Sequence, residues 1–262
     1  AQTCKAIAPP TRDGMLWNMP GNWDADIVPG EDYEDDVDLA GLYRSFNFGN
    51  SHVDTLTFSG GKLFVYGGLL RVNTLDGADI SMPADPGGGQ IWLEGALTGT
   101  NAISMDGGRL MNLGTLGGSL DVTATGEEVV FAYADGTAAS WTIASGRTVT
   151  LTAGVKAGFD GTGGAAASMT VATGGTLELV AADGALPAIK EFRTGINGET
   201  ATNVASTVTC GGTLSVDVTG IAAGTYDLVI ADTVSGTFAT ETITGGSGSI
   251  GYTGTKVQIT VT

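Results

Sequence analysis

Short stretches in which apolar and polar residues alternate run through the chain from about residue 56 to its C-terminus. Leu214, Val216 and Val218, for example, are separated by Ser215 and Asp217. The same period of two recurs at residues 148–152, 177–179 and 257–261. A period of two places alternate side chains on opposite faces of a β-strand. The pattern therefore predicts many short strands, each with one buried face.

Glycine pairs separate these stretches. The unit Gly-Gly-x-Leu occurs with its first glycine at positions 60, 67, 107, 117, 174 and 211. Glycine accepts the positive φ values of tight corners, and the leucine can turn inward to begin the next strand. Glycine pairs at 67, 87 and 107 are 20 residues apart, about one turn of a three-sided parallel β-helix. The predicted fold is all-β, a right-handed parallel β-helix (β-solenoid), with a β-sandwich or jelly roll as the alternative.

The distribution of prolines and of alternating apolar and polar residues predicts two regions. Residues 1–50 contain four of the seven prolines and are expected to form an irregular cap or docking segment, while residues 51–262 form the solenoid domain. Residues 184–203 interrupt the alternation and are interpreted as an insertion between coils. Part of this stretch, with Pro187 near its start, could form a turn or two of helix; an ordinary long loop is the alternative.

Aromatic residues are concentrated in the first 50 positions. The cap or docking candidates are Trp17, Trp23, Tyr33, Tyr43, Phe46 and Phe48. The first coil of a solenoid would otherwise expose its apolar interior, so these side chains are expected to plug that end. Docking to a partner or stacking on a sugar is the alternative role.

Composition narrows the functional classes. The formal net charge is −17, with 11 basic and 28 acidic residues. Such a charge repels phosphate backbones and anionic membranes, so we expect neither nucleic-acid binding nor membrane insertion. It also suits a surface that must stay soluble outside a cell.

Eight acidic residues lie between positions 24 and 38, with no Lys or Arg among them. Carboxylates suit Ca²⁺, and the candidate ligands are Asp32, Glu34, Asp36 and Asp38. The spacing lacks the repeated Asp pattern of known calcium loops, so a solvated acidic face or docking to a basic partner is favoured. We expect no cofactor and no catalytic metal.

His52 is the only histidine, so a transition-metal site or a Ser-His-Asp site would have to use this residue. The chain contains no Gly-x-Ser-x-Gly sequence and no phosphate-binding loop motif. A carboxylate pair for glycoside cleavage cannot be recognised. The chain is therefore expected not to be an enzyme.

The two cysteines, Cys4 and Cys210, are too few for a disulfide scaffold or a zinc site. A single bridge would tether the N-terminal segment to a late coil. Two unpaired thiols are the equal alternative.

Two segments resemble the passenger regions of bacterial autotransporters and related secreted surface proteins with β-strand repeats. The first comprises Asn22-Trp23, Pro29-Gly30 and residues 35–41; the second comprises residues 224–230, 235–238 and 252–261. The resemblance implies a β-solenoid on a cell or particle surface and brings no catalytic residue with it. Such passengers continue into a translocator, and none follows Thr262 in this sequence, which favours a subunit carried in an assembly.

The expected function is thus that of a non-catalytic structural protein on a virion exterior, as a bacteriophage head-decoration, fibre or spike subunit. The expected partners are further copies of the chain, in a trimer, and a capsid or other virion protein, with cell-surface carbohydrate as a further candidate. The alternatives are a secreted bacterial adhesin or matrix protein at the cell surface, and a polysaccharide-degrading tailspike-like enzyme.

Overall fold

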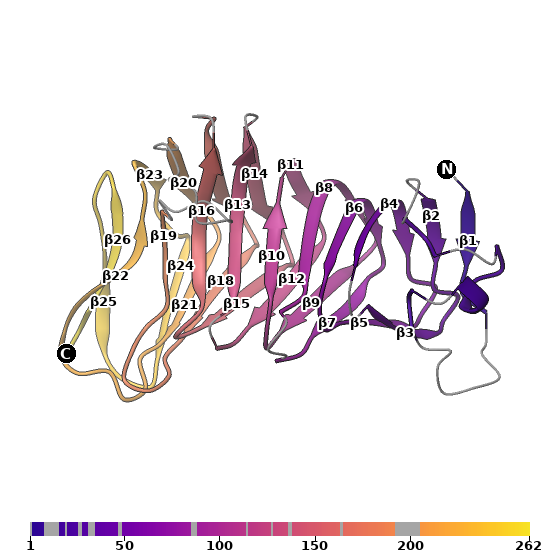
Figure 1. Cartoon of the computed structure of the whole chain (residues 1–262). Coiled ribbons are helices and arrows are strands. Elements are labelled where there is room, and N and C mark those ends of the chain that lie inside the picture. The colour runs from indigo at the N-terminus through magenta and orange to yellow at the C-terminus, as the bar shows by residue number, and fades with distance from the viewer. Residues whose placement is uncertain are drawn as a thin grey trace.

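The computed structural model places most of the chain in parallel β-strands, which lie side by side along one elongated body (Figure 1). The structure describes residues 2–7, 16–18, 20–25, 28–30, 35–46, 49–84, 88–113, 115–126, 128–135, 138–162, 165–191 and 205–262. The N-terminus and the C-terminus lie at opposite ends of this body (Figure 1).

The strands form three sheets. The 12-stranded sheet contains, in spatial order, β1 (Thr3–Lys5), β2 (Asp35–Asp38), β4 (Asn50–Thr57), β6 (Leu69–Asp76), β8 (Gln90–Thr98), β10 (Arg109–Asn112), β13 (Val129–Asp135), β16 (Lys156–Thr162), β19 (Ala188–Glu191), β22 (Gly224–Ile230), β26 (Lys256–Val261) and β25 (Gly248–Tyr252). The nine-stranded sheet contains β3 (Tyr43–Phe46), β5 (Lys62–Val65), β7 (Asp79–Met82), β9 (Asn101–Met105), β12 (Leu120–Ala124), β15 (Thr148–Thr152), β18 (Thr176–Val180), β21 (Thr213–Asp217) and β24 (Thr240–Thr244). The five-stranded sheet contains β11 (Thr115–Gly118), β14 (Ala139–Ile143), β17 (Ala167–Val171), β20 (Ser206–Cys210) and β23 (Thr233–Gly236).

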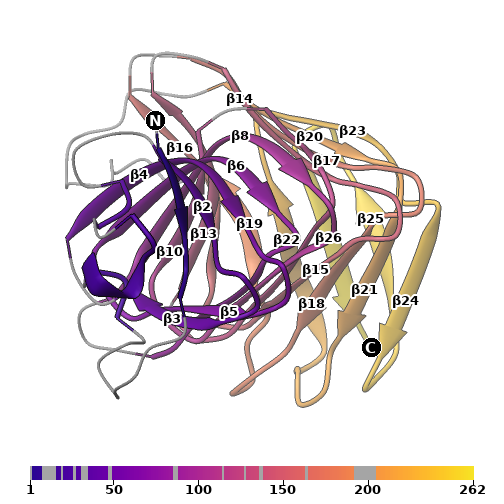
Figure 2. The ribbon, with the colours of Figure 1, turned by 90° about the vertical axis from the view of Figure 1, so that its right-hand side faces the viewer.

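From β2 to β24 the chain visits these sheets in turn, so consecutive strands belong to different sheets and each pairs with a strand of a neighbouring coil. From β2 to β9 it alternates between the 12-stranded and the nine-stranded sheets. From β10 onward it adds a strand of the five-stranded sheet in every coil. Figure 2 shows the strands of successive coils surrounding a common interior.

The coil length also increases along the chain. Leu70 pairs with Ile91, and Ile91 pairs in turn with Leu110, so an early coil takes about 20 residues. Leu110 pairs with Val130, so the first coil that contains a strand of the five-stranded sheet has the same length. Later, Val122 pairs with Val149 and Val149 with Leu177, so these coils take about 27 residues. The predicted 20-residue period therefore holds only for the first part of the chain.

An all-β fold with parallel sheets is confirmed, and it is compatible with a β-solenoid. A β-sandwich or jelly roll would consist of antiparallel sheets. Among the named strand pairs, only β26 is antiparallel, to β22 and to β25. The one helical element described is the short 3₁₀ turn η2 (Pro20–Asn22).

Two sequence-based boundaries look different in the structure. Inside residues 1–50, β2 and β3 pair in parallel with β4 and β5, so residues 35–46 continue the sheets that follow them. Inside residues 184–203, Ala188–Glu191 form β19, a strand of the 12-stranded sheet, so the described part of this stretch contains a strand, whereas the sequence left open a turn or two of helix or a long loop. The remainder of the predicted insertion, 192–203, lies outside the described residues.

The core runs along the inside of all coils. In the nine-stranded sheet one inward column is formed by Ile80, Ile103, Val122, Val149, Leu177 and Leu214, each paired with the next and each nearly inaccessible to solvent. Side chains that alternate with these point outward and are partly exposed. Because each coil covers the apolar side chains of its neighbours, burial is continuous along the body.

The glycine pairs act as predicted. In five of the six copies the pair directly precedes a strand, whose second residue is the buried leucine: Leu63, Leu70, Leu110, Leu177 and Leu214. The pair Gly117-Gly118 instead ends β11, and Leu120 begins β12. Gly108 shows why glycine is needed, because its φ is 86° and an added Cβ would contact the carbonyl oxygen of Gly89 in the adjacent coil.

A pair of substitutions separates the two roles of glycine at corners. Gly108→Ala should lower the free energy of unfolding by about 2–4 kcal/mol, because it adds backbone strain and a clash with the next coil. Gly146 has a similar φ of 74° but nothing near its Cβ position, so Gly146→Ala should cost only about 1 kcal/mol. Chemical denaturation of both variants measures the difference, and equal losses would contradict the close approach of the coils.

Candidate functional site

Two tryptophans and a phenylalanine fill the interior at the N-terminal end. The Trp17 ring lies edge-on to Trp23, with centroids 4.9 Å apart, and to Phe46, with centroids 5.8 Å apart. All three side chains are fully buried. Each indole has a partner, since Trp17 Nε1 donates to the Pro29 carbonyl and Trp23 Nε1 to the Trp17 carbonyl. These contacts fit a plug and leave none of the three rings available to a partner.

Arg44 completes this plug, and the sequence analysis missed it. It occupies an inward position of β3, paired with the core residue Leu63, and is 1% exposed. Its guanidinium donates to the carbonyls of Tyr43, Ile7 and Asn22 and lies 5.5 Å from the Trp23 ring. Burial lowers the pKa of Arg44. The alternation of the sequence could have revealed it, because Arg44 lies two residues before Phe46 and therefore on the same face of the strand.

The described part of the acidic run holds backbone groups. Asp24 accepts from the Lys5 amide, Asp35 from the amides of Gln2 and Gly30, and Asp38 from the amide of Ala40. Among the calcium candidates, Asp36 and Asp38 lie on β2, whereas Asp32 and Glu34 fall outside the described residues. In the described part of the chain, no three His, Cys, Asp or Glu side chains are grouped as a metal site would require.

The two cysteines are free thiols in the structure. Cys4 lies in β1 and Cys210 in β20, and both are buried. The pKa of each thiol is raised to about 11, by burial at Cys210 and, at Cys4, by burial together with the charges of Asp35, Asp24 and Asp36. Neither thiol is therefore a reactive nucleophile at neutral pH.

Three aromatic side chains follow one another on the outer face of the nine-stranded sheet. Tyr43 is 55% exposed and stacks on Phe64 at 6.4 Å, and Phe64 stacks on Tyr66 at 6.3 Å. Lys62 Nζ lies 5.8 Å from the Phe64 ring. We call Tyr43, Phe64 and Tyr66 the aromatic strip. Of the six aromatic candidates, Tyr43 is the exposed one among those described; Tyr33 and Phe48 lie outside the described residues.

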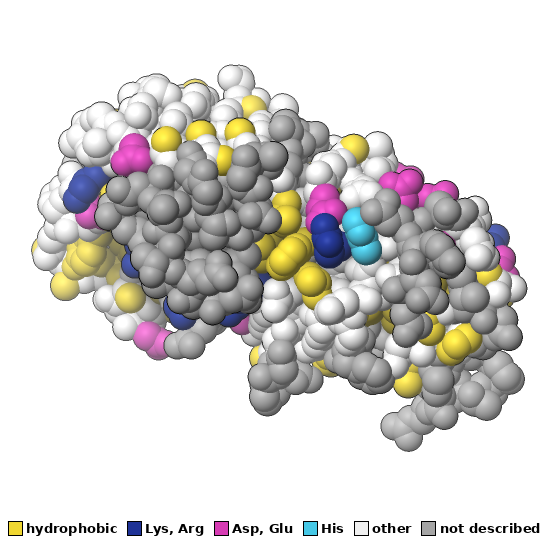
Figure 3. All heavy atoms as spheres, turned by 45° about the horizontal axis from the view of Figure 1, so that its top comes forward, with side chains coloured by type: hydrophobic (Ala, Val, Ile, Leu, Met, Phe, Trp, Pro, Cys, Tyr) yellow, Lys and Arg dark blue, Asp and Glu magenta, His cyan; other side chains and the backbone are white. Residues whose placement is uncertain are grey.

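A cluster of polar side chains on the outer face of β4, β6 and β8 surrounds the single histidine. His52 Nε2 lies 3.1 Å from Glu94 Oε2 and 3.3 Å from Asn73 Oδ1. Glu94 Oε1 accepts from Arg71, whose guanidinium lies 5.8 Å from the Trp92 ring. Figure 3 shows this group of acidic, basic and histidine side chains with hydrophobic side chains next to it.

The residues of this group come from three successive coils. His52 pairs with Arg71, and Arg71 with Trp92, so they form one outward column. Both oxygens of Glu94 are engaged by Arg71 and His52, and Asn73 donates to Asp54. Such a network joins neighbouring strands. We interpret this network as structural, holding neighbouring coils together, since its polar groups largely hydrogen-bond to one another.

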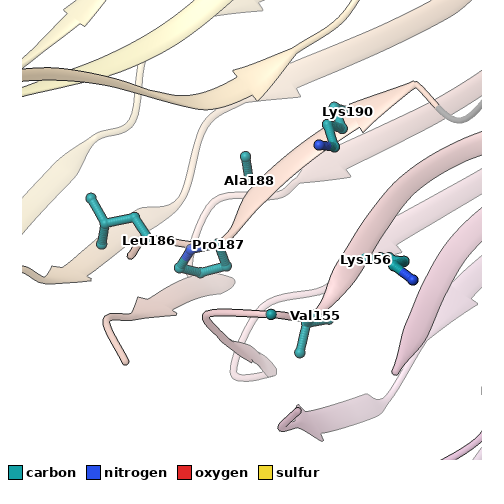
Figure 4. Close-up of a pocket in the computed structure, with 7 residues that line it drawn as sticks. Val155, Lys156, Leu186, Pro187, Ala188 and Lys190 are labelled. Atoms are coloured by element: carbon teal, nitrogen blue, oxygen red, sulfur yellow. The ribbon is translucent and has the colours of Figure 1, made fainter. Parts of the chain in front are cut away.

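A pocket of about 290 Å³ lies farther along the 12-stranded sheet, between β16 and the turn that leads into β19 (Figure 4). Lys156 and Lys190 lie on these neighbouring strands, and Leu186 and Pro187 form an apolar side. The tight turn before it is closed by mutual hydrogen bonds between Ala182 and Ala185. Sequence analysis missed this pocket because its residues are far apart in the chain and carry no motif.

No protein-family model, no curated protein and no solved structure matches this chain. Within the described residues, the structure contains no helix with the length and apolar character that crossing a membrane demands.

The plug can be tested by truncating its central ring. Trp17→Ala should destabilise the N-terminal coil by about 3–5 kcal/mol, because a fully buried aromatic ring is replaced by a cavity. Tyr43→Ala is the matched control, since this exposed ring on the adjacent β3 should cost less than about 1 kcal/mol. Amide hydrogen exchange of β2 and β3 measures both. Equal protection in Trp17→Ala and the unsubstituted chain would contradict the plug.

Proposed function

We propose that this chain is a non-catalytic structural protein on the exterior of an assembly, built as a right-handed parallel β-solenoid. The observation that carries the proposal is the continuous core, in which each coil buries the apolar side chains of the next from Trp17 to Val229. A body of this kind is stiff along its length, because bending would separate stacked side chains and break the hydrogen bonds between coils.

The right-handed sense rests on a general rule. A connection between parallel strands of one sheet is right-handed in about 98% of cases. Every coil of the parallel region makes such a connection within the 12-stranded sheet, from β2 to β4 and onward to β22.

The proposed location is the outside of a virion, as a bacteriophage head-decoration, fibre or spike subunit. The net charge of −17 and the resemblance to surface solenoids support an exterior position. The aromatic strip supports attachment, because the exposed ring of Tyr43 beside the half-buried rings of Phe64 and Tyr66 is a suitable anchor for a partner's apolar side chains. The alternative, a secreted bacterial adhesin or matrix protein, is favoured by the same strip, since aromatic faces also stack on sugars.

Trimerisation is part of the proposal. Three copies of the chain, each strongly acidic, repel one another at long range. A trimer therefore requires complementary contacts between the copies over a limited area. Sedimentation equilibrium at physiological ionic strength should give three times the mass of 26.3 kDa. A monomer at every concentration would remove the trimer without affecting the fold.

Electron microscopy of virions tests the location. Particles that lack this protein should lose an outer density, and the purified chain should restore it. Tyr43→Ser combined with Phe64→Ser should fail to restore it, whereas Thr242→Ala, an exposed change at the opposite end, should restore it fully. An unchanged outer density in particles without the protein overturns the virion proposal, and attachment of the labelled chain to bacterial cells would then favour the adhesin.

A further inference from the structure

The pocket between β16 and β19 contrasts in charge with the rest of the molecule. Lys62, Arg71, Arg147 and Lys256 each have a carboxylate within 3.1 Å. Lys156 and Lys190 have no such partner among the residues that the structure describes. In a chain with 28 acidic residues and only 11 basic ones, two lysines line this one pocket.

The register places these two lysines near each other on adjacent strands. Lys156 pairs with Ala188, and Lys190 pairs with Gly158, so the lysines occupy diagonal positions on adjacent strands. Diagonal neighbours are within reach of each other for long side chains. Their like charges repel, and an anion placed between them would relieve that repulsion.

A small residue makes room for a ligand beside the lysines. Ala188, directly opposite Lys156, lines the pocket with a side chain of a single carbon. Gly158 cannot be replaced freely, because an added Cβ would run into the Lys190 carbonyl oxygen. Leu186, Pro187 and Val155 supply apolar surface on the other side (Figure 4). The pocket therefore combines a cationic side with an apolar side.

We propose that this pocket binds one carboxylate-bearing sugar residue of an acidic polysaccharide. The lysines would hold the carboxylate through charge-assisted hydrogen bonds, and the C–H face of the ring would pack on Leu186 and Pro187. A volume of about 290 Å³ is near the lower limit for small-molecule pockets, which suits a single sugar ring.

A sugar fits this position better than an acidic peptide. Peptides commonly bind to sheets by adding a strand to a free edge. Both β16 and β19 are interior strands, since β16 pairs with β13 and β19, and β19 with β16 and β22. The backbone of this wall is thus used between coils, and recognition must come from side chains. The inference is independent of whether the body stands on a virion or on a cell.

Calorimetric titration with a glucuronate-containing oligosaccharide tests the proposal, with a neutral oligosaccharide of equal length and poly-glutamate as comparison ligands. The acidic oligosaccharide should bind, more weakly as salt is raised, and the neutral one should not. Lys156→Gln and Lys190→Gln should each weaken binding about threefold, and the double variant about tenfold, since both groups are exposed and screened.

Lys5→Gln is the matched control. Lys5 is an exposed lysine at the other end of the body, so this change alters the net charge equally and should leave affinity unchanged. Circular dichroism of each variant checks that the sheets are intact. Equal binding by the double variant, equal binding of the neutral sugar, or tighter binding of poly-glutamate would each overturn the proposal.

Discussion

The parallel register between coils is the constraint on which the rest of this structure depends. Because each strand hydrogen-bonds to the equivalent strand of the next coil, a side chain that points inward must lie on an inward side chain of both neighbours. The column from Ile80 to Leu214 is one result. A polar side chain in such a column is buried among apolar neighbours and must find hydrogen-bond partners there, as Asn101 does with the carbonyls of Thr98 and Ser119.

The two ends meet this constraint by different means. At the N-terminal end, Arg44 occupies the inward position of β3 that pairs with Leu63. Its guanidinium donates to three backbone carbonyls and lies over the Trp23 ring. At the C-terminal end, β26 runs antiparallel between β22 and β25. Lys256 and Gln258 donate to Asp227 across this pair, and these hydrogen bonds lower the pKa of the Asp227 carboxyl.

Side chains on the outer faces of the sheets need not be apolar, so the residue type at a given outward position can differ from one coil to the next. The aromatic strip, the network around His52 and the lysine pocket all lie there, each assembled from strands of neighbouring coils. In the first two, the side chains are largely one another's partners. The pocket between β16 and β19 differs because the described residues include no carboxylate paired with its two lysines.

The sequence alone determined the class of fold, because alternation and glycine corners are local properties that the chain cannot satisfy in many ways. The buried leucine after each glycine pair, the apolar columns and the tryptophan-rich end were all readable in it. Only the tertiary structure decided which outward residues meet, because Lys156 and Lys190, or His52 and Glu94, are brought together by coil length. That length increases after β13, and no pattern in the sequence predicted the increase. Arg44 shows the same limit at a single position, since a charge in an inward column is acceptable only where the folded cap supplies the carbonyls that receive it.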